Sequence, residues 1–480
     1  LQTDHRFLLG LCRRSGPDQP RERTPSADPS PRREVSVPKQ YLSVAFAYVG
    51  VVIGAGLASG QDLLQYFLSF GAKGLIGIAV LGVLNIVFGV VALQLGSYYR
   101  SGHHDEVFER IAPPLVRRAI DVVLVFSGFA MGVVMLSGAG ANLEQQFGIP
   151  AWAGSAICAV LVVVTAFLDF DRIMKVIGVF TPMIIVAISV LTIYSLLRSH
   201  PSVTELNAAA QNVTPALPNL WLSTINYFAL CVVNGIAMAF VLGGSVLRID
   251  VARKAGSLGG ALIALVIAAD AVTLFLNMDR IWDVGVPTLE IARRIHPAFA
   301  LLYTLIIFAL IYNTVFSLFY STARRFSGGS DQRMRVILTG VTATGYANSL
   351  VGFKKLVGGM YPIIGYLGIA LLVVLAIAWL HRRASVIREE NLRRKLIRVQ
   401  VRKHADDLEY TDADRAEAQI LARASVVDTT SLRRDADSIA EQIVATQDDA
   451  AAYARTQLPV DEELVAEQIA EALPDSTDSK

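Results

Sequence analysis

The sequence predicts an all-α membrane protein with ten transmembrane helices, built as a five-plus-five inverted repeat in which the first and sixth helices are broken. Three observations support this fold class: apolar segments that can cross a bilayer, two motifs that recur at nearly the same offset, and helix-breaking residues inside two segments. Hydrophobic residues make up 53% of the 480 residues. They lie in long, nearly charge-free segments, which a soluble core does not require.

Ten apolar segments divide the chain into three parts, since about 20 apolar residues suffice to cross hydrocarbon. The segments lie at roughly 41–70, 74–98, 120–142, 151–168, 176–197, 220–247, 256–276, 299–320, 335–353 and 360–380. Residues 39–381 are therefore expected to form the ten-helix transmembrane transporter domain. Residues 1–38 are expected to be a disordered cytoplasmic segment, and 382–480 a charged, largely helical cytoplasmic tail.

The distribution of basic residues predicts the orientation in the membrane. With the N-terminus inside, the short cytoplasmic loops carry about twice as many Lys and Arg residues as the external loops, as the positive-inside rule requires. His381, Arg382 and Arg383, after the last span, add to the same side. The prediction is a multi-pass protein of the plasma membrane with both termini in the cytoplasm.

An internal repeat is visible when the chain is compared with itself. Lys, Gly, Pro and Ile of residues 175–184 recur in residues 355–364 at an offset of 180. Glu, Arg, Ile and Pro of residues 106–113 recur in residues 290–297 at an offset of 184. Five spans are an odd number, so the second copy must be inserted upside down. Inverted repeats of this kind are typical of secondary transporters, whose site lies at the midplane.

The first segment contains four glycines at 50, 54, 56 and 60, and each costs roughly 1 kcal/mol in a helix interior. A break there would free backbone amides and carbonyls to hold a solute or an ion. The alternative is close helix packing through small residues at four-residue spacing. In the sixth segment, Asn234-Gly235 is a turn dipeptide in mid-membrane. It predicts a matching break near residues 234–238.

These features resemble the LeuT fold of the amino acid/polyamine/organocation superfamily. Within it, residues 54–62 (Gly-Ala-Gly-Leu-Ala-Ser-Gly-Gln-Asp) and 361–368 (Tyr-Pro-Ile-Ile-Gly-Tyr-Leu-Gly) are similar to YkvI-type membrane proteins. The resemblance covers about 41–380 and excludes both tails. It implies a secondary active transporter that moves a small organic solute, such as an amino acid, by alternating access.

The neurotransmitter:sodium symporters of that superfamily carry G-x-x-x-G-x-G in the first segment, and Gly50, Gly54 and Gly56 match it. The match implies substrate-binding and sodium-binding residues. The substrate-binding candidates are Gly54, Ala55, Gly56, Ser59, Ser127, Asn234 and Gly235, with the amides of Ala55 and Gly56 on a substrate carboxylate. The sodium candidates are the carbonyls of Gly50 and Ile53 and the side chains of Asn313 and Thr314. Leu57 stands where those symporters have an Asn ligand for a second sodium, which is therefore in doubt.

Two carboxylates are candidates for coupling or gating. Asp270 is the carboxylate well inside a span, where a charge costs about 2.5–3.5 kcal/mol on insertion scales. Thr273 and Asn277 follow it on one polar stripe. Asp270 is either a proton- or cation-binding group or a hydrogen-bonded packing residue. Asp62, after the first break, either gates the outer mouth or caps and bonds between helices.

The sequence offers no nucleophile paired with a base and no phosphate-binding loop, so the protein is not expected to be an enzyme or to bind nucleic acid. His103 and His104 lack spaced Cys or His partners, which leaves no cofactor except a possible Na⁺. The predicted function is a symporter whose partners are a small solute, a monovalent cation and the lipid bilayer. No basic residue lies at 176–197 or 299–319, which favours Na⁺ over H⁺ as the coupled ion.

A second function class stays open because of the tail. The chain could be a membrane sensor or scaffold on a transporter fold that signals through residues 382–480 to a cytosolic partner. Apolar positions such as Ile439 and Ile443 at helical spacing indicate amphipathic helices there. The simpler alternative is a solvated, poorly ordered tail.

Overall fold

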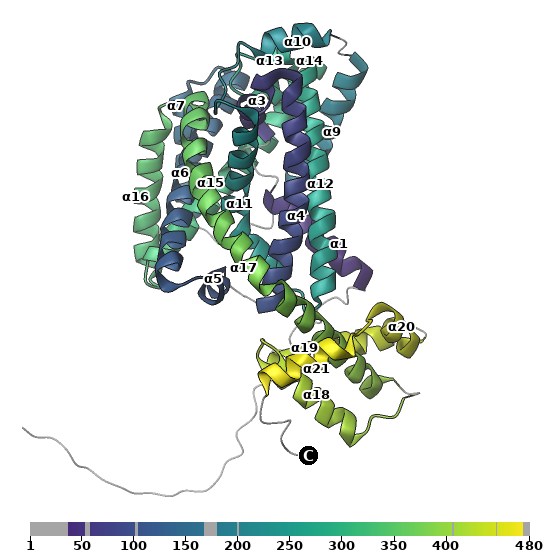
Figure 1. Ribbon diagram of the computed structural model, residues 1–480. Helices are drawn as coiled ribbons and strands as arrows, with labels where there is room; N and C mark the ends of the chain where they lie inside the picture. The colour runs from purple at the N-terminus through teal and green to yellow at the C-terminus, as the bar shows by residue number, and fades with distance from the viewer. Residues whose placement is uncertain are drawn as a thin grey trace, which may run out of the picture. The chain divides into compact units, whose positions relative to one another are not determined.

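The computed structural model describes residues 37–52, 58–100, 104–167, 180–198, 201–405, 408–447 and 449–473. Within these ranges the regular structure is helical and contains no strand. The long helices run side by side through a bundle, and further helices of the C-terminal region follow α17 (Figure 1).

The helices of the bundle follow the predicted segments in order. They are α1 (Val37–Val52), α3 (Gln61–Tyr66), α4 (Gly74–Tyr99), α6 (Pro114–Phe147), α7 (Ala151–Thr165), α9 (Phe180–Arg198), α11 (Leu220–Gly244), α12 (Ile249–Leu276), α15 (Pro297–Phe326), α16 (Asp331–Ser349) and α17 (Phe353–His404). Six helical stretches among the described residues are long and apolar enough to cross a membrane, and α7 and part of α9 are shorter apolar helices. The exact number of ten spans therefore stays a prediction.

Small residues let the central helices pack with their backbones in contact. A Cβ on Gly89 of α4 would lie 2.6 Å from the carbonyl oxygen of Gly256 on α12. A Cβ on Gly368 of α17 would lie 2.5 Å from the carbonyl oxygen of Ala229 on α11. No Cβ fits at such distances, so these glycines are required for the close helix contacts that membrane bundles use.

The described part of the first predicted segment is interrupted at Gly60, before α3. α1 ends at Val52 and α3 begins at Gln61, and Gly60 before α3 has a left-handed backbone with φ of 72°. Only glycine adopts this conformation readily. The predicted break at Gly54–Gly56 lies outside the described residues. The five-plus-five repeat with its broken first helix stays a prediction at that position.

The sixth segment corrects the sequence analysis, because α11 is one continuous helix from Leu220 to Gly244. The Asn234 side chain donates a 2.8 Å hydrogen bond to the carbonyl of Leu230, four residues earlier in the same helix. A helix break in hydrocarbon frees backbone groups at several kcal/mol each, whereas an interior glycine costs about 1 kcal/mol. The predicted break near 234–238 was therefore wrong.

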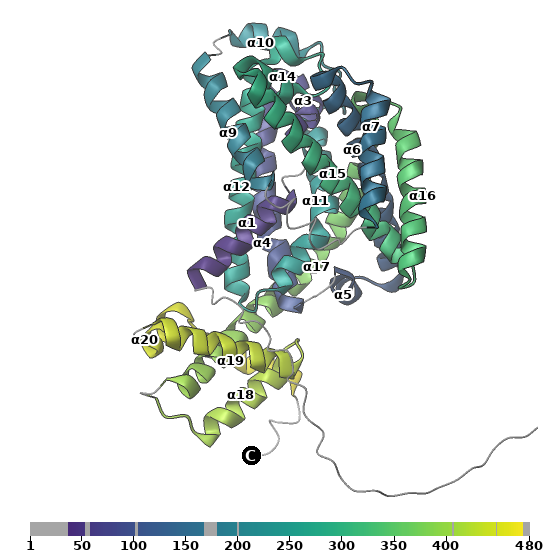
Figure 2. The same cartoon turned by 180° about the vertical axis from the view of Figure 1, so that it is seen from behind.

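Short helices close the two ends of the bundle. α5 (His104–Ile111) lies at the lower end, and α14 (Pro287–Ile295) lies at the upper end in both views (Figures 1 and 2). The two stretches that repeat in the sequence, 106–113 and 290–297, thus each contain most of a short helix. α10 (Val203–Ala210), α13 (Met278–Ile281) and the 3₁₀ helix η1 (Leu68–Lys73) also lie in connecting segments between the long helices.

The described part of the tail is helical and packed, which does not fit the alternative of a poorly ordered tail. α17 continues without interruption past the predicted end of the membrane domain to His404. It is followed by α18 (Asp412–Ala424), α19 (Thr429–Thr446), α20 (Ala450–Gln457) and α21 (Glu462–Ala472). These helices bury a separate apolar cluster that includes Leu396, Leu421, Leu432 and Ile443. Amphipathic helices can bury their apolar faces in this way.

Candidate functional site

A hydrogen bond between α3 and α11 lies at the centre of the bundle. The hydroxyl of Tyr227 donates a 2.6 Å hydrogen bond to one carboxylate oxygen of Asp62, and the backbone N–H of Leu63 donates to the other at 2.9 Å. Asp62 is only 3% exposed. Buried carboxylates need such donors because isolated charges are costly in the interior. These two donors position the Asp62 carboxyl group.

The carbonyl of Ala58, just before α3, accepts two hydrogen bonds from the upper end of the second half of the chain. The donors are the hydroxyl of Thr288 on α14 at 2.7 Å and the hydroxyl of Tyr303 on α15 at 3.0 Å. A carbonyl inside a regular helix bonds the amide four residues on. The interruption at Gly60 makes the Ala58 carbonyl available, and α14 and α15 use it.

Asp270 on α12 is the most unusual polar group in the molecule. It is 0% exposed, and neither oxygen of its carboxyl group has a hydrogen-bond partner among the residues that the structure describes. It interacts electrostatically with Asp62 and with Tyr303. We define Ala58, Asp62, Tyr227, Asp270 and Tyr303 as the central polar cluster. An ionised Asp270 in this environment would be uncompensated, so the cluster calls for a proton or a cation.

A second chain of hydrogen bonds ties α3 to α11 and α17. Tyr66 donates to the side-chain oxygen of Asn226 at 3.1 Å, and the Asn226 amide donates to the carbonyl of Pro362 at 3.0 Å. Gly365 allows this contact, because any Cβ there would collide with the Asn226 side chain. The helix segment that carries Asp62 is thus fixed to two helices of the second half of the chain.

The predicted polar stripe after Asp270 faces a different neighbour. Thr273 donates to Thr192 at 2.8 Å, and Asn277 donates to Ser195 at 2.9 Å. Thr192 and Ser195 belong to α9. These bonds hold α12 against α9, as polar side chains do between membrane helices. Thr273 and Asn277 therefore have a packing role that Asp270 lacks.

A polar cleft of about 430 Å³ opens beside α3 at the upper end of the bundle, and we call it the upper cleft. Gln61 and Gln65 line it directly next to Asp62. The opposite wall includes Trp282, Asp283 and Lys354, and Lys354 pairs with Asp283 at 3.3 Å. Gln65 also donates to the carbonyl of Lys354 at 3.2 Å. These contacts lie where the sequence predicted a gate at the outer mouth.

A smaller cavity of about 120 Å³ lies toward the lower end, and we call it the lower cavity. It is bounded by α6, α11 and α15, with Asn234 on one side and Thr322 and Arg325 on another. Tyr227 and Asn234 are seven residues apart on α11, which places them about 10 Å apart along the helix axis. Along α11, the central polar cluster therefore lies between the upper cleft and the lower cavity.

The predicted substrate-binding residues are only partly described. Gly54, Ala55 and Gly56 lie outside the described residues. Ser59 is buried directly before Gly60, and its hydroxyl oxygen accepts from the N–H of Gln61 at 3.3 Å. The Ser127 hydroxyl on α6 is buried and has no hydrogen-bond partner in the described part of the chain. Ser59 thus lies next to the central polar cluster.

Asn234 and Gly235 were predicted to bind substrate because a helix break was expected there, and α11 has no break. Gly235 lies within the continuous α11, and a Cβ there would meet Val52 of α1 at an ordinary 3.7 Å. Asn234 lies on the same helix at the lower cavity. Neither residue is at a helix break, so neither has a free backbone amide or carbonyl with which to bind a solute. Asn234 can contact a solute only through its side chain.

The predicted sodium residues are not joined by the contacts described. Ile53 lies outside the described residues, and Gly50 is in α1, whose main neighbours are α12 and α11. On α15, the Thr314 hydroxyl donates to the carbonyl of Leu310 at 2.9 Å. The side-chain oxygen of Asn313 is buried and accepts no hydrogen bond from any residue described. The sodium site stays a prediction.

Sequence reasoning missed the tyrosines of the cluster. Tyr227 and Tyr303 lie in apolar segments, where tyrosine reads as part of the hydrophobic face. A buried Tyr hydroxyl needs a partner, however, and Asp62 also lies within the first apolar segment. The available signal was the presence of tyrosines and carboxyl side chains in different apolar segments, where a buried phenol can pair with a buried carboxyl group.

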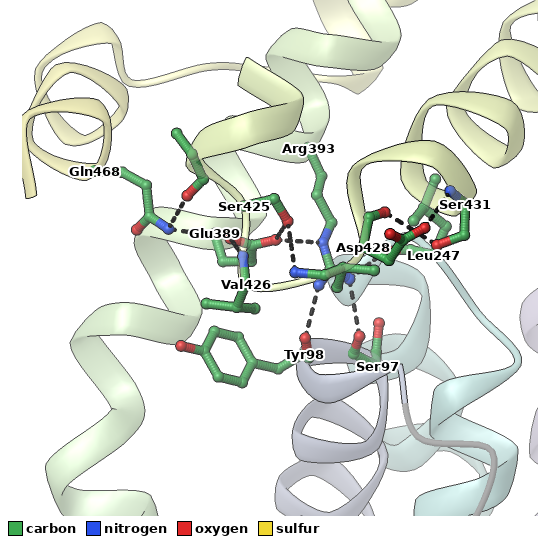
Figure 3. Close-up of polar contacts among 12 residues, drawn as sticks. Ser97, Tyr98, Leu247, Glu389, Arg393, Ser425, Val426, Asp428, Ser431 and Gln468 are labelled. Atoms are coloured by element: carbon green, nitrogen blue, oxygen red, sulfur yellow. Dashed lines mark hydrogen bonds and ion pairs between the residues drawn. The ribbon is translucent and has the colours of Figure 1, made fainter. Parts of the chain in front are cut away.

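The tail is joined to the bundle through one buried arginine (Figure 3). Arg393 of α17 is 1% exposed and bonds Glu389 at 2.8 Å. Its other nitrogens donate to the carbonyls of Ser97 and Tyr98 at the end of α4, at 2.8 and 2.7 Å, and of Leu247 after α11, at 3.0 Å. The ends of two bundle helices thus meet at one side chain.

Glu389 extends this contact into the tail helices. It accepts hydrogen bonds from the hydroxyl of Ser425 between α18 and α19, from the N–H of Val426, and from the Gln468 amide of α21 (Figure 3). The Glu389–Arg393 pair therefore links the fold of the tail to the lower ends of α4 and α11, and an ion pair of Arg100 with Asp435 adds a second contact between α4 and α19.

Two proteins of Bacillus subtilis (strain 168) are similar in sequence. The chain is 28% identical to the membrane protein YkvI over 350 residues, which are 72% of this chain and 97% of YkvI. It is 22% identical to the protein YyaD over 327 residues, which are 68% of this chain and 93% of YyaD. YkvI is matched almost end to end, so this chain has segments beyond the shared part. No family model matches the chain.

Two solved structures are similar in fold. MhsT in complex with L-phenylalanine has a TM-score of 0.50 and 17% identity, covering 85% of this chain and 98% of MhsT. Mhp1 in an inward-facing conformation has a TM-score of 0.47 and 14% identity, covering 89% of this chain and 93% of Mhp1. Identities this low show only a shared fold. The conclusion about the fold rests on MhsT. The predicted resemblance is confirmed: the chain is a membrane protein similar to YkvI, with a LeuT-type transporter fold.

Proposed function

We propose that the protein is a secondary active transporter that carries a small organic solute across the plasma membrane, with both termini in the cytoplasm. The observation that carries this proposal is the central polar cluster, in which Asp62 and Asp270 are both buried and, among the residues described, Asp62 has hydrogen-bond partners and Asp270 has none. A carboxyl group without a partner in a membrane bundle is typical of ion and proton pathways. Structural packing alone gives no reason to retain it.

The placement of the two cavities supports alternating access. The upper cleft reaches Gln61 and Gln65, which flank Asp62, and the lower cavity reaches Asn234, two turns beyond Tyr227 on α11. A transporter needs one central site with a separate route to each side of the membrane. In this state the contact of Gln65 with Lys354 narrows the upper route beside the cluster.

Asp270 is the group that we propose for coupling. A proton on the carboxyl group, or a cation bound to it, would remove the uncompensated charge. The neutral oxygens predicted for sodium, from Gly50, Ile53, Asn313 and Thr314, favour a weakly held monovalent cation over a divalent one. Na⁺ is therefore the first ion to test and H⁺ the second.

The proposed solute is an amino acid or a similar small carboxylate. MhsT, the neighbour in fold, was solved with L-phenylalanine. In this chain the amides of Ala55 and Gly56, which lie outside the described residues, are the groups that we propose for the carboxylate of the solute. The Ala58 carbonyl and the hydroxyl groups of Thr288 and Tyr303 lie close to this stretch in the chain or in space. They would limit the size of the solute.

Thermal-shift screening of the purified protein against the common amino acids, with and without Na⁺, tests this function first. We expect at least one solute to raise Tm, and to raise it more with Na⁺ or at a different pH. Proteoliposomes should then take up that solute only under an imposed Na⁺ or H⁺ gradient. Binding without gradient-driven uptake would instead favour a sensor.

The sensor is a second candidate because of one observation, the Glu389–Arg393 link. It joins the ends of α4 and α11 to three tail segments through buried hydrogen bonds. A conformational change of the bundle that moved these helix ends would disturb the tail. A sensor or scaffold would show tail changes on solute binding, measurable by hydrogen exchange of α18 to α21, without solute uptake.

A further inference from the structure

The tail contains a cleft of about 530 Å³ between α17, α18 and α19, and we call it the tail cleft. Sites for small molecules usually have about 300–1,000 Å³. The same three helices surround the apolar cluster of Leu396, Leu421 and Leu432. The walls of the cleft are therefore held by a packed core rather than by loose loops.

The charge of the tail cleft is strongly positive. Among the residues that the structure describes, its lining holds Lys403, Arg415, Arg433 and Arg434 and one carboxylate, Asp437. That carboxylate is already bonded to Lys403 and to His404, each at 2.8 Å. Burial raises the pKa of Asp437, but the hydrogen bonds from Lys403 and His404 outweigh this effect and keep it below its ordinary value. Asp437 therefore stays ionised and does not neutralise the arginines.

The arginines retain capacity for an anion. Arg433 has no ion-pair partner anywhere in the described part of the chain. Arg434 lies 3.5 Å from Asp435, and Arg415 lies 3.0 Å from Asp412, and both side chains are well exposed. Exposed pairs of this kind are weak, so an anionic ligand can replace them. Guanidinium groups bind phosphate oxygens in two-pronged geometry.

The first turn of α19 contributes two residues to the same lining, Thr429 and Thr430. Its backbone amides are already in use, because the Asp428 carboxylate accepts hydrogen bonds from the N–H groups of Thr430 and Ser431. This cap satisfies amides that have no partner inside the helix. The arginines are therefore the groups that would bind a phosphate.

A buried amide gives an independent sign of a ligand. Gln400 of α17 lines the tail cleft and is only 4% exposed. Its side-chain oxygen is buried without a hydrogen-bond partner among the described residues. An unpaired buried amide is unfavourable, and a ligand in the cleft that donates and accepts hydrogen bonds would satisfy it. Tyr410, half-buried in the same lining, offers an aromatic ring for stacking.

From these features we propose that the tail cleft binds a soluble phosphate ester of nucleotide size. The arginines would hold the phosphates, and Gln400 and Tyr410 would contact the base or an equivalent planar group. Gln400 and Arg393 are two helical turns apart on α17. The ligand would thus act next to the link between the tail and the bundle, which makes the tail a regulatory domain.

The test is isothermal titration of the full-length protein in phosphatidylcholine nanodiscs, with ATP and inorganic pyrophosphate as separate probes. Saturable binding of ATP is expected, with weaker binding of pyrophosphate. Arg433→Ala should weaken ATP binding by about tenfold. Arg423→Ala, which removes an exposed arginine of α18 outside the cleft, is the matched control and should bind like the wild type.

Gln400→Leu separates binding from folding. This substitution removes an unpaired buried amide, so Tm should be unchanged or higher while ATP binds less tightly. Absence of saturable binding of both probes, or an equal loss in Arg423→Ala, would overturn the proposal. ATP could also bind in phosphatidylcholine nanodiscs, fail to bind in phosphatidylglycerol nanodiscs, and bind again when detergent displaces the lipid. That result would assign the cleft to lipid headgroups instead. Binding is measured without transport, so neither outcome bears on the transport proposal.

Discussion

The hydroxyl of Tyr227 on α11 donates a 2.6 Å hydrogen bond to the carboxylate of Asp62 on α3. This bond joins the short helix after the interrupted first segment to a helix from the second half of the chain. It also distinguishes Asp62 from Asp270, whose carboxyl group has no partner among the described residues. The two carboxyl groups therefore differ: Asp62 is held in place by donors, whereas no described residue donates to Asp270.

Tyr227→Phe should destabilise the protein by about 1–3 kcal/mol, because it removes a donor from a buried carboxylate. Tyr361→Phe is the matched control. Tyr361 is equally buried, but its hydroxyl has no hydrogen-bond partner in the part of the chain that is described. Thermal unfolding in detergent should show a lower Tm for Tyr227→Phe only. Equal Tm values for the two variants would contradict the role given to this bond.

Gly368→Ala should loosen the packing of α11 against α17. The added Cβ would lie 2.5 Å from the carbonyl oxygen of Ala229, and overpacking of this kind typically costs about 1–3 kcal/mol. Gly359→Ala on the same helix has no atom within 4 Å of its added Cβ, and it should unfold like the wild type. If Gly368→Ala is as stable as Gly359→Ala, then α11 and α17 are further apart than the structure shows.

Arg393→Ala should detach the tail from the bundle. It leaves Glu389 buried without its charge partner and three carbonyls without a donor, a change that typically costs about 3–5 kcal/mol. The half-buried Arg398, which forms no ion pair among the described residues, provides Arg398→Ala as control. Limited proteolysis should cleave α18 to α21 faster only in Arg393→Ala. Unchanged digestion would show that other contacts hold the tail.

Much of the fold could be predicted from local sequence. Apolar length located the long helices, and the matched stretches 106–113 and 290–297 located α5 and α14. These features depend on local composition, which a sequence displays directly. The close contact of Gly89 with Gly256 was not predicted, because the sequence does not show which segments are neighbours.

The candidate site was harder to predict because it depends on contacts between distant segments. Asn234-Gly235 reads as a turn in water, but in α11 the Asn234 amide bonds its own helix and the turn does not form. Asp62 and Asp270 were found as charges in apolar segments, whereas Tyr227 and Tyr303 were hidden among hydrophobic residues. The buried Arg393 lay in a tail whose charges suggested solvent exposure.

The central claim is that the Asp270 carboxyl group couples a cation to transport. It is tested most directly by uptake of the solute found in the screen into proteoliposomes, comparing wild type with Asp270→Asn from about pH 5 to about pH 8. Asp331→Asn, at an exposed carboxylate paired with Arg324, is the control. The wild type and the control should require a Na⁺ or H⁺ gradient, whereas Asp270→Asn should fold normally and lose gradient-driven accumulation and its pH dependence. Accumulation by Asp270→Asn that matches the wild type at every pH would contradict the claim and make Asp270 a packing residue.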